Sequence, residues 1–100
     1  MIIEKTIKLK DELYFYIFKI MNDNIYHFNL TDSQILVLSE LYKEDFKLKE
    51  HIKSYSLRMS QLFSNESKNT IMEKCKLSYN TFNNVLTVLR KKEFIIENTI

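Results

Sequence analysis

The side chains with the clearest binding chemistry lie between residues 79 and 87, where asparagine and threonine are concentrated. An asparagine amide can form two hydrogen bonds with adenine, and a threonine can contact either a thymine methyl group or a phosphate. The apolar residues that would face inward from a helix over this segment are Phe82, Val85, Leu86 and Leu89. On the opposite, polar face, the candidate base-contacting residues are Tyr79, Asn80, Thr81, Asn83, Asn84 and Thr87.

Basic residues flank this polar segment and carry the excess positive charge of the chain. The formal net charge is +2, and residues 64–100 hold six basic side chains against four acidic ones. Lysine and arginine neutralise DNA phosphates, so such binding depends strongly on salt concentration. The candidate phosphate-contacting residues are Lys68, Lys74, Lys76, Ser78, Arg90, Lys91 and Lys92. Residues 90–92 also fit a structural role, because cations interact favourably with the C-terminal end of a helix dipole.

The absence of glycine excludes several classes of enzyme. P-loops, dinucleotide-binding turns and nucleophile elbows need glycine where the backbone approaches a ligand or takes a positive φ. The sequence shows no carboxylate pair in an apolar setting and no Ser/His/acid arrangement. Cys75 is expected to be a small core residue, and His27 and His51 are far apart with no ligand pattern around them. We therefore expect no enzyme activity, no cofactor and no metal site.

The overall composition indicates one globular domain over residues 1–100. Apolar residues make up 45% of the chain and charged residues 28%, which suits one compact core. No apolar run approaches the length of a membrane span, and the single cysteine fits a reducing cytoplasm. Residue types with A/T-rich codons dominate, while glycine, alanine and proline are absent, which indicates an AT-rich bacterial or phage genome.

Hydrophobic periodicity predicts a mainly α-helical chain, although the first thirty residues are ambiguous. Residues 13–18 have the aromatic and β-branched content of a strand, but the apolar spacing favours a helix that ends near Asn22. Residues 25–30 are expected to be extended. Thr31 and Gln34 then have the spacing of a capping box, which predicts a helix to about Glu44.

Two further helical regions follow. The apolar residues of segment 48–63 recur at spacings of three and four, which predicts an amphipathic helix. In the last third of the chain, Ser67 and Ser78 are expected to cap two short helices separated by a break at residues 76–77. Two short helices joined by so brief a turn must cross steeply, as in a helix-turn-helix unit over residues 67–92.

This helix pair resembles the helix-turn-helix of winged-helix DNA-binding domains. The apolar positions of the family's unit, counted from Lys68, fall on Ile71, Cys75, Leu77, Phe82 and Val85. Segment 89–95 is similar to the family's ending, in which a leucine and basic residues precede glycine and two apolar residues that enter a strand. Segment 30–41 is similar to the helix that precedes the unit in MarR-like regulators.

The resemblance implies a mainly α, winged-helix-like domain with four to five helices and one or two short strands. It implies that residues 79–92 lie in the major groove of double-stranded DNA, in transcriptional or replication control. It also implies a homodimer, because such regulators bind two-fold sites, and the aromatic residues 14–18 could supply the dimer surface. The alternative is a protein-interaction module, a dimerising adaptor or inhibitor that uses residues 13–30 to bind a host or viral protein without DNA.

Four features depart from the resembled family. Lys76 and Glu93 stand where glycine is usual, so each position either tolerates a positive φ at a cost on the order of 1 kcal/mol or is built differently. Met72 replaces a small residue, which predicts a wider helix crossing. The helix over 48–63 is additional. One strand over Phe94–Glu97 fits the remaining residues, whereas a full wing hairpin does not.

Overall fold

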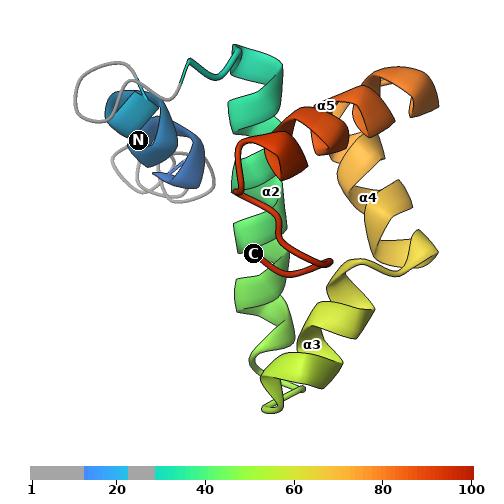
Figure 1. Cartoon of the computed structure of the whole chain (residues 1–100). Coiled ribbons are helices and arrows are strands. Elements are labelled where there is room, and N and C mark those ends of the chain that lie inside the picture. The colour runs from blue at the N-terminus through green and yellow to red at the C-terminus, as the bar shows by residue number, and fades with distance from the viewer. Residues whose placement is uncertain (1–12, 23–28) are drawn as a thin grey trace, which may run out of the picture.

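The computed structural model describes residues 13–22 and 29–100 and is mainly helical. Residues 13–22 are helical, as expected, and four helices follow: α2 (Asp32–Leu48), α3 (Tyr55–Leu62), α4 (Asn65–Cys75) and α5 (Tyr79–Lys91). In Figure 1, α2 runs through the middle of the molecule, with α4 and α5 on one side and segment 13–22 on the other. None of the described helices is long and apolar enough to cross a membrane.

The capping box predicted for α2 is confirmed. The Gln34 N–H donates to Thr31 Oγ1 at 3.3 Å, and the Thr31 N–H donates to Gln34 Oε1 at 3.0 Å. The helix continues to Leu48, four residues beyond the expected end at Glu44. It is longer because Asp45 and Leu48 continue its inward face, where Asp45 binds a partner on α3 and Leu48 packs against the core.

The helix predicted over residues 48–63 is wrong in its first part. Residues 49–54 connect α2 to α3, and helix formation restarts at Ser54, whose hydroxyl accepts the Leu57 N–H at 3.4 Å. The N–H groups of His51 and Ile52 both donate to the Leu48 carbonyl oxygen, which closes the end of α2 as a turn. Local capping at Ser54 thus outweighs the apolar periodicity.

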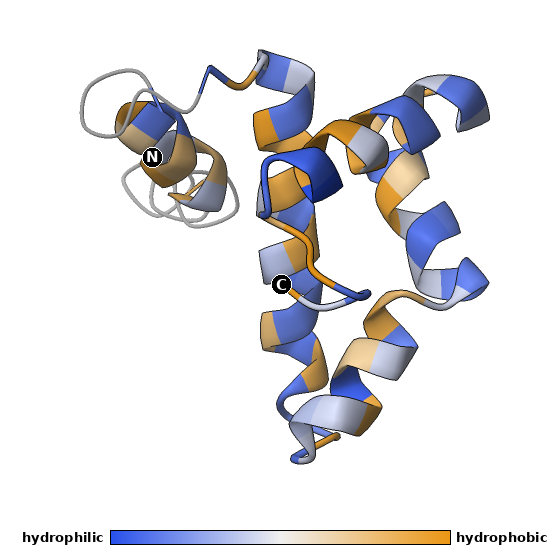
Figure 2. Ribbon diagram, viewed as in Figure 1, coloured by the Kyte–Doolittle hydropathy of each residue, from blue (hydrophilic) through white to orange (hydrophobic). Residues whose placement is uncertain are grey.

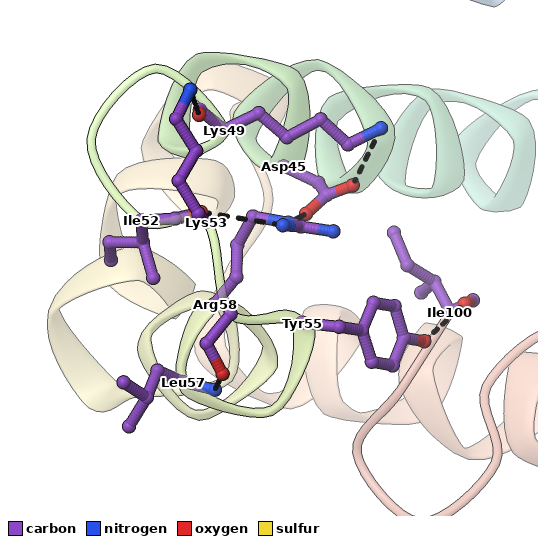
Figure 3. Close-up of polar contacts among 9 residues, drawn as sticks. Asp45, Lys49, Ile52, Lys53, Tyr55, Leu57, Arg58 and Ile100 are labelled. Carbon is purple, nitrogen blue, oxygen red and sulfur yellow. Dashed lines mark hydrogen bonds and ion pairs between the residues drawn. The ribbon is translucent and has the colours of Figure 1, made fainter.

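A buried ion pair fixes α3 against α2 (Figure 3). Arg58 Nε donates to Asp45 Oδ1 at 2.5 Å, and both residues are only 8% exposed. Arg58 also donates to the Ile52 carbonyl oxygen at 3.4 Å and lies 5.4 Å from the centre of the Tyr55 ring. The Tyr55 hydroxyl in turn donates to the Ile100 carbonyl oxygen at 3.0 Å, which ties the end of the chain to α3. This cluster satisfies the polar atoms that the packing of α3 on α2 removes from water.

The apolar faces of α2, α3, α4 and α5 meet in one core. All four α5 residues predicted to face inward are buried, and Leu89 is fully so. The buried apolar residues are Leu30, Ile35, Val37, Leu38, Leu41, Met59, Leu62, Phe63, Ile71, Cys75, Phe82, Val85, Leu86, Leu89 and Ile95. Phe15 and Phe18 of segment 13–22 pack against this core while half-buried. The core therefore fixes α5 by one face and leaves its opposite face open.

The strand predicted over Phe94–Glu97 is wrong, and no strand forms in the part of the chain that the structure describes. Ile95 is buried, and Ile96 and Thr99 exchange two backbone hydrogen bonds of 2.9 Å across a two-residue turn. Figure 2 shows the hydrophobic colouring of the segment that follows α5 where it passes α2. Glu97 and Asn98 both take positive φ, 49° and 57°, as in a type I′ turn. Because the chain reverses direction at this turn, the pairing stops at the single bridge between Ile96 and Thr99 and does not extend into a strand.

Candidate nucleic-acid interface

The first helix of the predicted pair begins two residues earlier than Ser67, so that predicted cap is wrong. Ser64 is the cap of α4, and its hydroxyl oxygen accepts the Ser67 N–H at 3.3 Å. Ser67 lies inside the helix and is buried, 6% exposed. Both serines have the side chain of a good cap, and the burial of Ser67 leaves Ser64 to fill that role.

The turn between α4 and α5 contains the left-handed residue that the absence of glycine put in question. Lys76 takes φ 56° and ψ 40°. Its N–H donates to the Glu73 carbonyl oxygen at 3.1 Å, and the Leu77 N–H donates to the Met72 carbonyl oxygen at 3.2 Å. This pair of bonds is a Schellman motif, which ends a helix at one left-handed residue. The predicted break at residues 76–77 is confirmed, and the positive φ is tolerated by a residue with a Cβ atom.

The end of α5 repeats this arrangement. Glu93 takes φ 65°, its N–H donates to the Arg90 carbonyl oxygen at 3.1 Å, and the Phe94 N–H donates to the Leu89 carbonyl oxygen at 2.9 Å. Lys76 and Glu93, the two positions where the resembled family favours glycine, therefore both adopt the conformation that glycine favours. The hydrogen bonds that satisfy the last carbonyl groups of each helix hold them there.

The predicted cap of α5 is confirmed at Ser78. Its hydroxyl oxygen accepts the Thr81 N–H at 3.3 Å, and its hydroxyl proton is donated to Thr81 Oγ1 at 2.9 Å. Ser78 and Thr81 were predicted to contact phosphate and base, and each already uses polar atoms in this cap. In this structure Ser78 and Thr81 cap the N-terminus of α5, the helix on which the other predicted base-contacting residues lie.

The open face of α5 carries most of the predicted base-contacting residues. Tyr79 is 68% exposed, Asn80, Asn84 and Thr87 are also exposed, and Asn83 is half-buried. Positions 80, 84 and 87 are four and three residues apart, so they follow one another along a single helix face. The Thr87 hydroxyl donates to the Asn83 carbonyl oxygen at 2.9 Å, so its proton is used within the helix. The polar groups presented outward are thus mainly the two amides of Asn80 and Asn84.

The cations predicted to contact phosphate differ in their surroundings. Lys76, Arg90 and Lys91 are exposed side chains at the two ends of α5. Lys74 instead forms an ion pair with Glu44 of α2 at 3.7 Å, and Lys92 donates to the Asn29 carbonyl oxygen at 2.8 Å. The remaining candidate, Lys68, is half-buried on α4. Lys76, Arg90 and Lys91 therefore place exposed positive charge where α5 begins and ends.

Lys74 of α4 and Lys47 of α2 both have shifted pKa values. A side-chain hydrogen bond with Lys47 raises the pKa of Lys74, burial opposes that rise, and the charge of Glu44 adds to it. The same hydrogen bond lowers the pKa of Lys47. Lys74 is therefore part of the contact between α4 and α2, a role that its sequence position did not reveal.

Cys75 is a core residue, as expected. It is 6% exposed, and burial, followed by the charge of Glu40, raises the pKa of its thiol to about 12. Of the two histidines, His51 is exposed and His27 lies outside the described residues. Residues 13–22 and 29–100 contain no group of three or more His, Cys, Asp and Glu side chains placed to hold a metal ion.

Comparison of the chain with family models, with curated proteins and with solved structures found no match.

Proposed function

We propose that this protein binds double-stranded DNA with a sequence preference, through α5 in the major groove, and acts in the control of transcription or replication. The observation that carries the proposal is the open face of α5, where Asn80, Asn84 and Thr87 follow one another and cations stand at both ends. The helix-turn-helix likeness adds support, because the α4–α5 turn takes a left-handed residue at Lys76.

The dimensions and chemistry of α5 suit this role. A helix of 13 residues is about 20 Å long and about 10–12 Å wide, and the major groove is about 12 Å wide. Asn80 and Asn84 lie one turn apart, so each amide can pair with a different adenine along the groove. The Thr87 hydroxyl already binds the backbone, which leaves its methyl group for contact with thymine. The preferred site is therefore rich in A·T pairs.

Phosphate contacts come from the ends of the same helix. Lys76 precedes α5, and Arg90 and Lys91 form its last turn, so the cations bracket the polar face. Each phosphate that they neutralise releases bound counterions, which gives a slope of about −0.9 in log affinity against log salt concentration. Lys91→Met is expected to reduce that slope by about 0.9. The matched control is Lys53→Met, which removes a charge from the α2–α3 connection.

The test is a titration with AT-rich and GC-rich duplexes at several salt concentrations. We expect tighter binding of the AT-rich duplex, and expect Asn80→Ala with Asn84→Ala to lose most of that preference at unchanged salt slope. Each lost bidentate pair removes about 1–3 kcal/mol of discrimination. The control is Asn69→Ala, an exposed asparagine on α4. Undetectable binding at low salt, or a preference that survives the double substitution, would refute the proposal.

The proposal includes a homodimer formed through segment 13–22. Leu13, Tyr16, Ile17 and Ile20 are each about half exposed, at 49%, 46%, 44% and 54%. Their spacings of three, one and three residues place them on one helix face. Packing against the same face of a second copy would bury these four side chains. The resulting dimer would have the two-fold symmetry that matches two half-sites on DNA. Sedimentation of the wild-type chain and of Ile17→Lys tests this, with a monomeric variant expected.

The same apolar face favours a second candidate function, a protein-interaction module that needs no DNA. The two candidates respond differently to charge reversal at the end of α5. Arg90→Glu with Lys91→Glu abolishes DNA binding if the first is right. A stable complex with a heterologous protein that survives this reversal, without any DNA affinity in the wild-type chain, would establish the second.

A further inference from the structure

Asn22 and Lys92, which are far apart in the sequence, bind two consecutive residues just before α2, Leu30 and Asn29 respectively. Asn22, at the end of segment 13–22, is 8% exposed, and its side-chain amide binds both backbone groups of Leu30. The Leu30 N–H donates to Asn22 Oδ1 at 2.8 Å, and Asn22 Nδ2 donates to the Leu30 carbonyl oxygen at 3.2 Å. A buried amide that uses both of its ends is orientationally fixed, so segment 13–22 cannot shift without breaking these bonds.

The neighbouring residue, Asn29, is bound by a side chain from the end of α5. Lys92, directly after α5, donates to the Asn29 carbonyl oxygen at 2.8 Å, across 63 residues of sequence. Asn29 takes φ 58°, a left-handed conformation that asparagine tolerates better than most residues. One ion pair adds to the same region, because Lys19 lies 2.8 Å from Asp32 in the first turn of α2.

We propose that residues 29–30 form a joint that couples segment 13–22 to the basic end of α5, with Lys92 shared between the Asn29 carbonyl oxygen and a DNA phosphate. The coupling itself stands on the contacts of the free protein. The sharing of Lys92 rests on the proposed function, since Lys92 directly follows two cations expected to reach phosphates.

The direction of the coupling follows from the chemistry of the two acceptors. An ammonium group binds a charged phosphate more strongly than a neutral carbonyl oxygen. DNA therefore draws Lys92 away from Asn29 and loosens the hold on the adjacent Leu30 peptide. Linkage is reciprocal, so an event that displaces segment 13–22 and loosens the joint also weakens the hold of the Asn29 carbonyl oxygen on Lys92 and strengthens DNA binding.

The Leu30 amide proton reports directly on the joint, because it is buried and bound to Asn22 Oδ1. We expect Lys92→Met to speed its hydrogen exchange, measured by NMR on the free full-length chain, about two- to fivefold, the change that follows from losing one modest hydrogen bond. Lys91→Met makes the same charge change one residue earlier, on an exposed side chain, and should leave the exchange rate unchanged. Equal exchange rates in wild type and Lys92→Met would overturn the coupling.

A second variant and a DNA titration complete the test. Asn22→Ala should speed Leu30 exchange and, if Lys92 is shared, tighten binding to an AT-rich duplex in the wild-type background but not in Lys92→Met. Saturating DNA should speed Leu30 exchange while amides in the centre of α2 stay protected. If DNA binds but Leu30 exchange is unchanged or slower, the sharing is refuted. If no DNA binds at all, the proposed function and the sharing both fail, whereas the exchange rates of the free variants still decide the coupling.

Discussion

Replacing Lys76 separates the two roles that this residue holds, the left-handed helix end and a candidate phosphate contact. Lys76→Ala removes the ammonium group and keeps the Cβ atom, whereas Lys76→Gly removes both. Any difference between the two variants therefore isolates the backbone conformation at φ 56°. The comparison is cleaner than either variant against wild type, because both variants lose the same charge and the same exposed side chain.

The size of the difference follows from two opposing terms. A Cβ atom in the left-handed region costs roughly 1–2 kcal/mol, which Lys76→Ala retains and Lys76→Gly relieves. Glycine is in turn about 0.5–1 kcal/mol less favourable because the unfolded chain is more flexible. The net expectation is that Lys76→Gly is more stable than Lys76→Ala by about 0.5–1 kcal/mol. For a chain of this size the melting temperature should differ by about 2–8 °C.

Urea denaturation followed by circular dichroism measures this difference, and a thermal melt checks it independently. DNA affinity supplies the second readout, because both variants should lose the same amount of binding through the missing cation. A Lys76→Gly chain that is no more stable than Lys76→Ala would refute the argument that the Cβ atom strains this turn. Unequal DNA affinities of the two variants would show that the turn also positions α5.

Three other expectations concern the core and its polar contacts. Leu89→Ala, at a fully buried position of α5, should lower the free energy of unfolding by about 2–5 kcal/mol in urea titration, and a loss below 1 kcal/mol would contradict the packing described. Arg58→Met should destabilise by about 3 kcal/mol because it leaves the Asp45 carboxylate buried, and adding Asp45→Asn should recover part of that loss. Because the pKa of Cys75 is raised from 9.0 to about 12, the folded state disfavours the thiolate, and this contribution to stability is present below pH 9 and declines as pH rises toward 12. A thiol reagent at neutral pH should then label Cys75 only as fast as the chain unfolds, and rapid labelling of the native protein would contradict its burial.

Local sequence signals predicted the helix starts well where one residue could fill the cap. Thr31 with Gln34, and Ser78 ahead of an apolar stripe, place their caps correctly because the capping partner lies three residues away. Ser64 and Ser67 illustrate the limit. Both are competent caps, and the choice depends on the burial of Ser67, which no local pattern encodes.

Contacts between distant residues were not predictable from spacing. Asp45 and Arg58 are 13 residues apart on different helices, and no local pattern in the sequence pairs them. Their ion pair joins the end of α2 to α3 and fixes where α3 packs. In the candidate interface, the sequence identified the polar face of α5, whereas the diversion of Lys74 to Glu44 and of Lys92 to Asn29 depends on the tertiary fold.

The absence of glycine has a structural consequence at the turns. Among the described residues, 13–22 and 29–100, five that carry a side chain take positive φ: Asn29, Lys76, Glu93, Glu97 and Asn98. Two of them end α4 and α5, one precedes α2, and two form the final turn, so each lies at a connection between elements rather than within one. The hydrogen bonds around each turn must offset a conformational cost that glycine would reduce. The turns on both sides of α5 therefore hold a reserve of stability, which glycine substitutions at Lys76 and Glu93 would release without touching the polar face proposed to read DNA.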